Sequence, residues 1–166
     1  MIKIILLIAL FGASGFLGFQ TAKVFESKTK FYKDALDFTK NIKAEISFLK
    51  TDIISLLSKY NFSSKFENVK NDIKELYKSN KEISIDDIKH TINKYITIKD
   101  EEVNIISQMF FELGQLGYIE QIERLEYYIN HFQSVLSKEK DRADKMMPFC
   151  KKMGVLIGLL VCIVLI

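Results

Sequence analysis

The last fourteen residues of the chain, residues 153–166, carry no charged side chain and directly follow Lys151 and Lys152. A helix of this length covers only about 21 Å, against a hydrocarbon core of roughly 30 Å. Residues 146–150 would lengthen it if the two lysines extend their ammonium groups to the membrane surface, with Pro148 marking a kink or a helix boundary. We predict a C-terminal transmembrane helix over residues 151–166. A terminal helix buried in a soluble core is the alternative.

A second uncharged apolar run, IILLIALFGASGFLGF, occupies residues 4–19 and follows Lys3. By itself this run is typical of a secretory signal, because small residues around Ser14 and at Ala22 suit a signal peptidase. The presence of two apolar ends favours an uncleaved hairpin, which returns the intervening domain to one side of the membrane. We therefore predict an N-terminal transmembrane helix over residues 1–22, with a cleaved signal peptide as the alternative.

Basic residues flank both apolar runs on the side of the intervening chain. They are Lys23, Lys28, Lys30 and Lys33 after the first run, and Lys138, Lys140, Arg142, Lys145, Lys151 and Lys152 before the second. Because basic residues near transmembrane helices favour the cytoplasmic side, we predict that residues 23–150 are cytoplasmic. The predicted membrane-flanking residues are Lys3, Lys23, Lys151 and Lys152.

Residues 23–150 hold 21 basic and 21 acidic side chains, so the domain itself is electrically neutral. This balance argues against a nucleic-acid-binding protein. Cys150 and Cys162 both lie in or beside the C-terminal run, and their spacing fits neither a disulfide framework nor a zinc site.

Between the apolar ends, hydrophobic residues recur at helical spacing, without the sustained alternation of a strand. The expected helices cover residues 27–60, 64–79, 84–95, 100–113 and 118–146. Ser64 with Glu67 forms a capping box, Ser84 caps the next helix, and Asp100 is expected to cap the fourth. The last helix leads into a charged stalk over residues 137–150. The predicted fold is all-α: a membrane-anchored helical bundle with a hydrophobic helix at each end.

Each of these helices presents one apolar face, which we expect to form the core of the bundle. The residues predicted to face this core are Phe31, Ala35, Phe38, Ile42, Leu49, Ile53, Leu56, Tyr60, Phe66, Val69, Ile73, Leu76, Ile85, Ile88, Ile92, Tyr95, Val103, Ile106, Phe110, Leu113, Ile119, Ile122, Leu125, Ile129, Phe132 and Leu136. The domain is long enough for one core and too short for two.

Candidate catalytic or metal-binding chemistry is sparse. His90 follows Asp86 and Asp87 by one turn, a spacing that can contribute to a metal site but is commoner among solvated surface residues. His131 has no companion histidine. The sequence contains no phosphate-binding glycine loop, no dinucleotide-binding motif and no CxxC pair. We expect neither an enzyme nor a cofactor, a metal ion or a small-molecule substrate.

Charge is segregated along the predicted bundle. Residues 23–99 hold 16 basic and 11 acidic side chains, whereas residues 100–136 hold seven acidic side chains and one basic side chain, Arg124. One interpretation is that acidic and basic helices pair within the bundle or face water. The other is that the acidic segment docks a basic partner.

The acidic segment contains a regular stripe, because Glu120, Glu123 and Glu126 recur at every third residue. Together with Glu112, these residues are the predicted partner-binding site. The lysines expected to be exposed on the basic segment include Lys70, Lys74 and Lys78.

A glycine turn precedes this stripe. The sequence LGQLG at residues 113–117 places Gly114 and Gly117 after a predicted helix, and glycine at such positions typically ends a helix. We expect this turn to reverse the chain between the fourth helix and the last.

The layout of the whole chain resembles the stage III sporulation protein AB family. The resemblance is strongest in the glycine turn and in the tail KMMPFCKKMGVLIGLL at residues 145–160, and Glu45-Ile46 matches a further stretch of the first long helix. The chain departs from the family in the turn, which has one residue fewer between its glycines, with Glu120 in place of an aspartate.

The resemblance implies a domain similar to the cytoplasmic domains of type II secretion and type IV pilus inner-membrane platform proteins. It implies a non-enzymatic scaffold in the channel-like complex that links mother cell and forespore during endospore formation. The implied partners are the membrane and other stage III sporulation channel proteins, including a secretion-type ATPase, with the domain facing the mother-cell cytoplasm. The alternative is an extracytoplasmic helical binding module that carries a signal peptide and is held by a C-terminal anchor.

Overall fold

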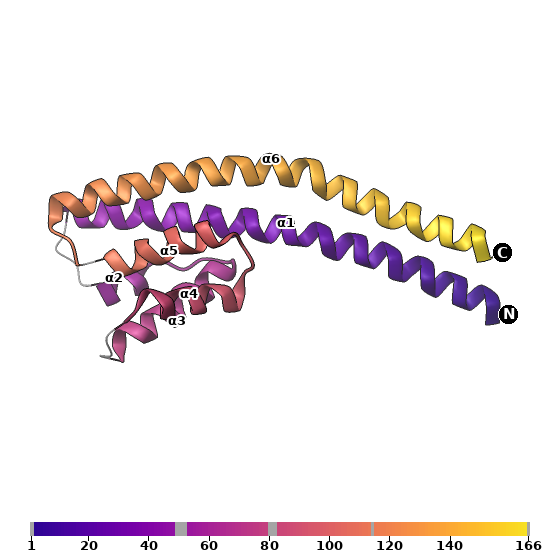
Figure 1. Ribbon diagram of the computed structural model, residues 1–166, viewed down its shortest axis with the longest axis horizontal. Helices are drawn as coiled ribbons and strands as arrows, with labels where there is room; N and C mark the ends of the chain where they lie inside the picture. Colours follow the sequence, from indigo (N-terminus) through magenta and orange to yellow (C-terminus); the bar gives the residue numbers. More distant parts are fainter. Residues whose placement is uncertain (1, 49–52, 80–82, 114, 166) are drawn as a thin grey trace. The chain divides into compact units, whose positions relative to one another are not determined.

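A computed structural model describes residues 2–48, 53–79, 83–113 and 115–165, with side chains for residues 7–46, 54–79, 83–113 and 115–164. Within these ranges the chain forms α-helices and no strand, which confirms the predicted all-α class (Figure 1). The helices are α1 (Ile2–Phe48), α2 (Ile53–Lys59), α3 (Lys65–Lys78), α4 (Ile85–Tyr95), α5 (Asp100–Glu112) and α6 (Tyr118–Leu165).

The chain divides into two compact units. Unit 1 comprises Met1–Thr29 and Ser137–Ile166, and unit 2 comprises Lys30–Leu136. Both α1 and α6 therefore contribute one part to each unit. The predicted membrane boundaries after residue 22 and before residue 151 stay predictions, because compactness alone does not locate a bilayer.

The core of unit 2 is centred on phenylalanine rings from three helices. Phe38 of α1 lies 5.4 Å from Phe66 of α3 and 5.6 Å from Phe110 of α5, measured between ring centroids. Phe31 meets Phe66 edge to face at 5.6 Å. Such ring pairs stabilise beyond the apolar area that they bury. These aromatic contacts hold α1, α3 and α5 together.

Most residues predicted to face the core are buried. Those half-buried at its edge are Tyr60, Leu76, Ile85, Tyr95 and Ile122. Leu49 and the side chain of Ile53 lie outside the described part of the chain. The helical periodicity of the sequence thus identified the apolar faces of α3, α4 and α5 correctly.

The first predicted helix of unit 2 is wrong in its extent. α1 ends at Phe48 and α2 is a separate helix, whereas the sequence indicated one helix to about residue 60. Glu45 forms an ion pair with Lys59 and accepts a hydrogen bond of 2.9 Å from the Tyr60 hydroxyl. In one straight helix, positions 45 and 59 would be about 21 Å apart. The chain therefore turns back, which the apolar spacing alone could not reveal.

Among the predicted core residues that the structure describes, Ile119 alone is turned outward, at 72% exposed. The prediction joined Ile119 to Leu125 by two steps of three residues. Each such step falls about 60° short of a full turn, so Ile119 lies about 120° around the helix from Leu125. Leu125, Ile129 and Phe132 are buried as predicted.

Two helix ends also differ from expectation. Lys99 holds the cap position of α5, and Asp100 is its first helical residue rather than its cap. α6 continues through Pro148 to Leu165, so Pro148 is not a helix boundary. A proline within a helix removes one backbone hydrogen bond. The helix nevertheless continues on both sides of Pro148.

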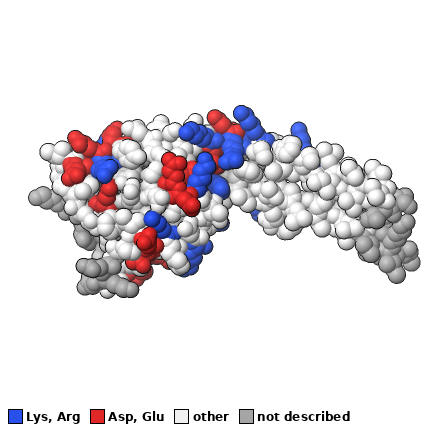
Figure 2. All heavy atoms as spheres, viewed as in Figure 1, with Lys and Arg blue, Asp and Glu red and all other residues white. Residues whose placement is uncertain are grey.

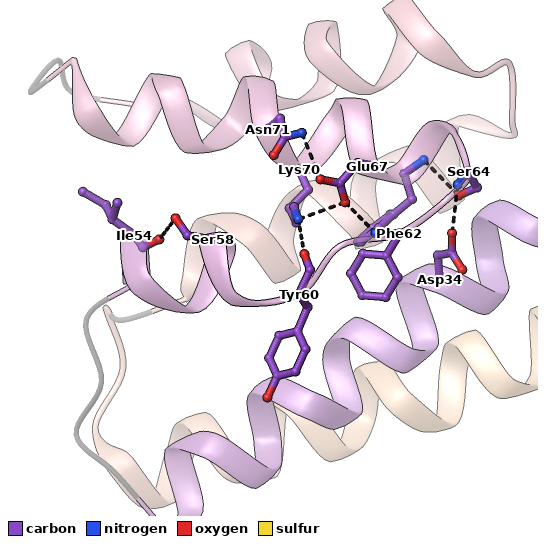
Figure 3. Close-up of polar contacts among 10 residues, drawn as sticks. Asp34, Ile54, Ser58, Tyr60, Phe62, Ser64, Glu67, Lys70 and Asn71 are labelled. Carbon is purple, nitrogen blue, oxygen red and sulfur yellow. Dashed lines mark hydrogen bonds and ion pairs between the residues drawn. The ribbon is translucent and has the colours of Figure 1, made fainter.

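Ser64 and Ser84 cap α3 and α4 as predicted, but only Ser84 forms a capping box, with Asp87. Glu67 instead accepts a hydrogen bond of 2.8 Å from the Phe62 backbone N–H. The Ser64 backbone N–H donates to Asp34 of α1 at 3.2 Å. Figure 3 shows these contacts around the segment that joins α2 to α3. They tie this connection to α1 and to the first turns of α3.

Lys70 of α3 completes this cluster, and it corrects the expectation that Lys70 is an exposed lysine. Its side chain is 1% exposed, its ammonium group lies 2.9 Å from the Glu67 carboxylate, and it donates to the Tyr60 carbonyl (Figure 3). Burial opposes the charged form of Glu67, but the hydrogen bonds from Lys70 and Phe62 outweigh it and hold the pKa of Glu67 below its ordinary value. The pair Glu67–Lys70 therefore stabilises the fold in its ionised form.

We expect Glu67→Gln to destabilise the protein by about 1 to 3 kcal/mol at neutral pH, because it leaves the buried Lys70 ammonium without its carboxylate. A lowered folded-state pKa contributes stability above the ordinary carboxyl pKa, and this contribution is lost as pH falls through the lowered value. The difference between wild type and Glu67→Gln should therefore shrink on acidification. Thermal unfolding of the full-length protein in mild detergent, followed by circular dichroism at several pH values, measures it.

Glu75→Gln is the matched control, since Glu75 pairs with Lys78 at the same spacing on the same helix but is 64% exposed. Exposed ion pairs contribute little, so its melting temperature should stay close to that of wild type. Equal losses in the two variants at neutral pH would contradict a special role for the buried pair.

Candidate functional site

The apolar ends of the chain pack against each other within unit 1 through glycines. A Cβ added to Gly18 of α1 would lie 2.7 Å from the Cys150 carbonyl oxygen and 3.0 Å from the Gly154 Cα atom. A Cβ on Gly154 of α6 would lie 2.9 Å from the Ser14 carbonyl oxygen. The two backbones are therefore in direct contact, at a distance that only glycine permits.

Further contacts continue this pairing along both helices. A Cβ on Gly158 would collide with the Ser14 hydroxyl, and the Cys162 thiol lies 3.7 Å from the Leu7 carbonyl oxygen. In the other direction, Thr29 donates to the Glu139 carbonyl at 3.5 Å. Early residues of α1 thus meet late residues of α6, so the two segments form an antiparallel pair.

Sequence reasoning missed this contact, although its signal was present. Gly154 and Gly158 form a GxxxG motif, and Ser14 and Gly18 form the corresponding pair of small residues at the same spacing. Such motifs let helix backbones approach closely in lipid, where the hydrophobic effect between helices is absent. The predicted hairpin of terminal helices is therefore supported by an interface suited to a membrane.

The outer surface of this helix pair is apolar. Its exposed side chains include Ile8, Phe16, Leu17, Phe19, Leu156, Leu160, Ile163 and Val164. In the described part of the chain, α1 and α6 are the two helices that are long and apolar enough to cross a membrane. Lys23, Lys151 and Lys152 are exposed beside the apolar segments, while the side chain of Lys3 lies outside the described residues.

On one side of the glycine contact, the helices leave an open hollow of about 290 Å³. Its lining is apolar except for the Cys150 thiol and two hydroxyls, those of Ser14 and Thr21. Both hydroxyls already donate at 2.9 Å to carbonyls of their own helix. The hollow therefore lacks the convergent polar groups that bind a soluble ligand.

The predicted partner-binding glutamates lie on or beside α6 in unit 2, in two different situations. Glu126 forms an ion pair with Lys43 of α1. Glu112 accepts a hydrogen bond of 2.7 Å from the Tyr128 hydroxyl and lies 3.3 Å from the Arg124 guanidinium. These two carboxylates serve contacts within the bundle.

Burial, reinforced by the hydrogen bond to the Glu112 carboxylate, raises the pKa of Tyr128 well above its ordinary value. Tyr128 thus stays a hydrogen-bond donor at all physiological pH values. The Tyr128–Glu112 contact therefore fixes the end of α5 against α6.

Glu120 and Glu123 remain on the exposed side of α6, and the structure places two hydrophobic side chains with them. Ile119, Glu123 and Tyr127 are spaced by four residues, so they share one helix face. That face is opposite the buried Leu125, and Tyr127 is 51% exposed. We call Ile119, Glu120, Glu123 and Tyr127 the α6 face.

The glycine turn lies between α5 and α6. Gly117 accepts a backbone hydrogen bond of 2.8 Å from the Gln121 N–H, the first turn of α6, and a Cβ added there would meet nothing within 4 Å. Gly114 lies outside the described residues. Gly117 therefore directly precedes α6, but its position imposes no steric need for glycine.

The residues that suggested a weak metal site are engaged elsewhere or solvated. Asp87 completes the capping box of α4 with Ser84, Asp86 lies 3.3 Å from Lys89, and His90 is exposed. Over the described ranges, no group of three or more His, Cys, Asp and Glu side chains is placed to hold a metal ion.

We expect Gly154→Leu to separate the terminal helices, because the new side chain would enter the space held by Ser14 and Gly18. The cost should be about 1 to 3 kcal/mol, typical of overpacking a close contact. Thermal unfolding of the full-length protein in mild detergent measures it. Gly15→Leu is the control, since a Cβ at Gly15 meets nothing within 4 Å. A melting temperature lowered equally by both substitutions would contradict the contact.

Comparison with known proteins gives one result. The family described as stage III sporulation protein AB matches residues 3–166 of the chain. No curated protein and no solved structure matches it. Because the family match extends over essentially the whole sequence, as the resemblance in the tail and the turn predicted, the chain belongs to the stage III sporulation protein AB family and has its role in sporulation.

Proposed function

We propose that this protein is a non-enzymatic membrane platform, which holds a component of the channel-like complex between mother cell and forespore against the membrane. In this proposal α1 and α6 anchor the chain, and unit 2 faces the mother-cell cytoplasm. A secretion-type ATPase or a neighbouring channel protein is the partner. Family membership supports the sporulation role, and the α6 face supports the docking role.

The observation that carries the proposal is the exposure of Ile119 and Tyr127 on the same helix face as two acidic residues, Glu120 and Glu123. A large aliphatic side chain that is 72% exposed gains little hydrophobic stabilisation from the folding of its own chain. Tyrosine is enriched at protein interfaces, and a few apolar anchors supply most of the binding energy there. The α6 face combines such anchors with Glu120 and Glu123.

The charge of this face favours a basic partner. Arg124, the one basic residue among residues 100–136, is engaged with Glu112, so it does not neutralise Glu120 or Glu123. Complementary charge raises the encounter rate and fixes the orientation of a complex more than it raises affinity. Glu126 is not part of this docking surface, because its carboxylate pairs with Lys43.

The glycine contact favours a retained N-terminal helix over a cleaved signal peptide. Cleavage at Ala22 would remove both Ser14 and Gly18, the α1 side of the contact with Gly154. Cleavage near Ser14 would remove Leu7, which contacts Cys162. Either cleavage would expose surface that the two helices now share. Ala22 itself is 1% exposed. A retained helix and a basic flank together support the cytoplasmic placement of unit 2.

We expect Glu120→Lys combined with Glu123→Lys to leave the helical content unchanged, because exposed charges contribute little to stability. The double variant should copurify less with the secretion-type ATPase or the neighbouring channel proteins, and it should lower spore yield. Tyr127→Ala should weaken the same interaction by about tenfold or more if Tyr127 is an anchor. Copurification from sporulating cells, with the protein at normal levels, measures both effects.

The control is Glu75→Lys combined with Glu101→Lys, which makes the same change of charge at exposed sites on α3 and α5. This control should sporulate normally. Normal spore yield from the Glu120 and Glu123 variant would refute docking at the α6 face. Its glutamates would then be ordinary surface residues that face water.

The topology predicts the accessibility of a cysteine introduced as Gln108→Cys, an exposed site on α5, in a variant with Cys150→Ser and Cys162→Ala. A membrane-impermeant thiol reagent should label it only after the cells are permeabilised. Efficient labelling in intact cells would instead support the extracytoplasmic binding module.

A further inference from the structure

Two ammonium groups converge on one aromatic ring in unit 1. The Lys23 nitrogen lies 4.9 Å from the centroid of the Phe19 ring, and the Lys151 nitrogen lies 5.6 Å from the same centroid. Lys23 belongs to α1 and Lys151 to α6, so the pairing of the two helices brings the charges together. The negative faces of an aromatic ring attract cations, and Phe19 thereby positions both.

Within the described part of the chain, these two charges have no acidic partner. None of the ion pairs among the described residues includes Lys23, Lys151 or the neighbouring Lys152. All three lysines are exposed. By contrast, Arg142 of the same unit has Glu139 at 3.7 Å. The lysines around Phe19 therefore present uncompensated positive charge, which an anion would neutralise.

The lysines mark the point where the charged surface ends. Phe19 ends the apolar run of residues 4–19, Lys23 is the next charged residue, and the uncharged run of residues 153–166 begins directly after Lys152. Figure 2 shows blue spheres of Lys and Arg beside an extended surface without charged residues. For a helix pair inserted in a bilayer, this level coincides with the lipid headgroups.

The surface of α1 beyond Phe19 has room for an acyl chain. Gly15 and Gly12 precede Phe19 by four and seven residues, so they lie on the same side of α1. A Cβ added at either glycine would meet nothing within 4 Å. Because glycine has no side chain, this side of α1 is lowered at Gly15 and Gly12. These two positions form a shallow track that leads from Phe19 towards the apolar end of the helix.

We propose that Phe19, Lys23, Lys151 and Lys152 form a binding site for the headgroup of an anionic phospholipid. The phosphate lies between the ammonium groups, and an acyl chain runs along the track at Gly15 and Gly12. A zwitterionic lipid fits less well, because its own cation meets the lysines. The inference rests on the membrane anchoring of the proposed function and is independent of docking at the α6 face.

The test uses the full-length protein in vesicles of phosphatidylcholine mixed with phosphatidylglycerol. After mild detergent extraction, native mass spectrometry counts the lipids of each class that stay bound. Wild type should retain phosphatidylglycerol in preference to phosphatidylcholine. Lys23→Gln combined with Lys151→Gln should lower this preference about tenfold or more, because each lysine near an anionic membrane surface strengthens binding several-fold. Lys23→Arg combined with Lys151→Arg should keep it.

Lys138→Gln combined with Lys140→Gln is the matched control, since it removes two exposed lysines of the same unit that are remote in sequence from Phe19. The control should retain the wild-type preference. Equal losses in control and test variants would overturn the site in favour of a general charge effect. Displacement of phosphatidylglycerol by millimolar glycerol phosphate would also overturn it, since the site would then take a free phosphate.

Flotation of the same proteins with vesicles of phosphatidylcholine alone reports anchoring separately. Failure to float would show that α1 and α6 do not anchor the protein in a membrane, which would contradict both the proposed function and the lipid site. Flotation without lipid preference would overturn only the lipid site.

Discussion

The backbone contact between Gly18 of α1 and Gly154 of α6 is the constraint on which unit 1 depends. Apolar helices in lipid gain little from the hydrophobic effect, so close packing of small residues has to hold them together. The same two helices continue into unit 2, where they supply Phe38 and Phe132 to the core. The apolar ends are thus structural parts of the chain, joined covalently to the bundle through unbroken helices.

Charged residues outside the apolar segments fall into two groups with different physical roles. Buried or paired charges such as Lys70 hold the bundle together, because a buried charge is costly unless a partner compensates it. Other charges, such as Glu123 on the α6 face and Lys151 beside Phe19, have no such role in the bundle. They lie next to exposed apolar or aromatic surface, which is the arrangement that a binding surface requires.

Much of the fold could be predicted because its signals are local. Helical periodicity identified the all-α class and most of the core, and the hydroxyls of Ser64 and Ser84 indicated where two helices begin. Uncharged runs marked the two helices that are long and apolar enough to span a membrane. The composition of the acidic segment indicated the candidate docking region. Each signal depends on a few consecutive residues and one helix geometry, so no distant contact was needed to interpret it.

The sequence by itself thus determined the class of structure and the family, whereas tertiary contacts decided which side chains are free to act. The pairing of Glu45 with Lys59 shows that the chain turns back after α1. Lys70 is buried where the segment that joins α2 to α3 packs against it, with the Tyr60 carbonyl and the Glu67 carboxylate as its partners. Ile119 is exposed because the helices packed against α6 bury a different face, the one that carries Leu125, Ile129 and Phe132. A periodic pattern gives relative positions around one helix but not its rotation against the others, and that rotation follows from packing.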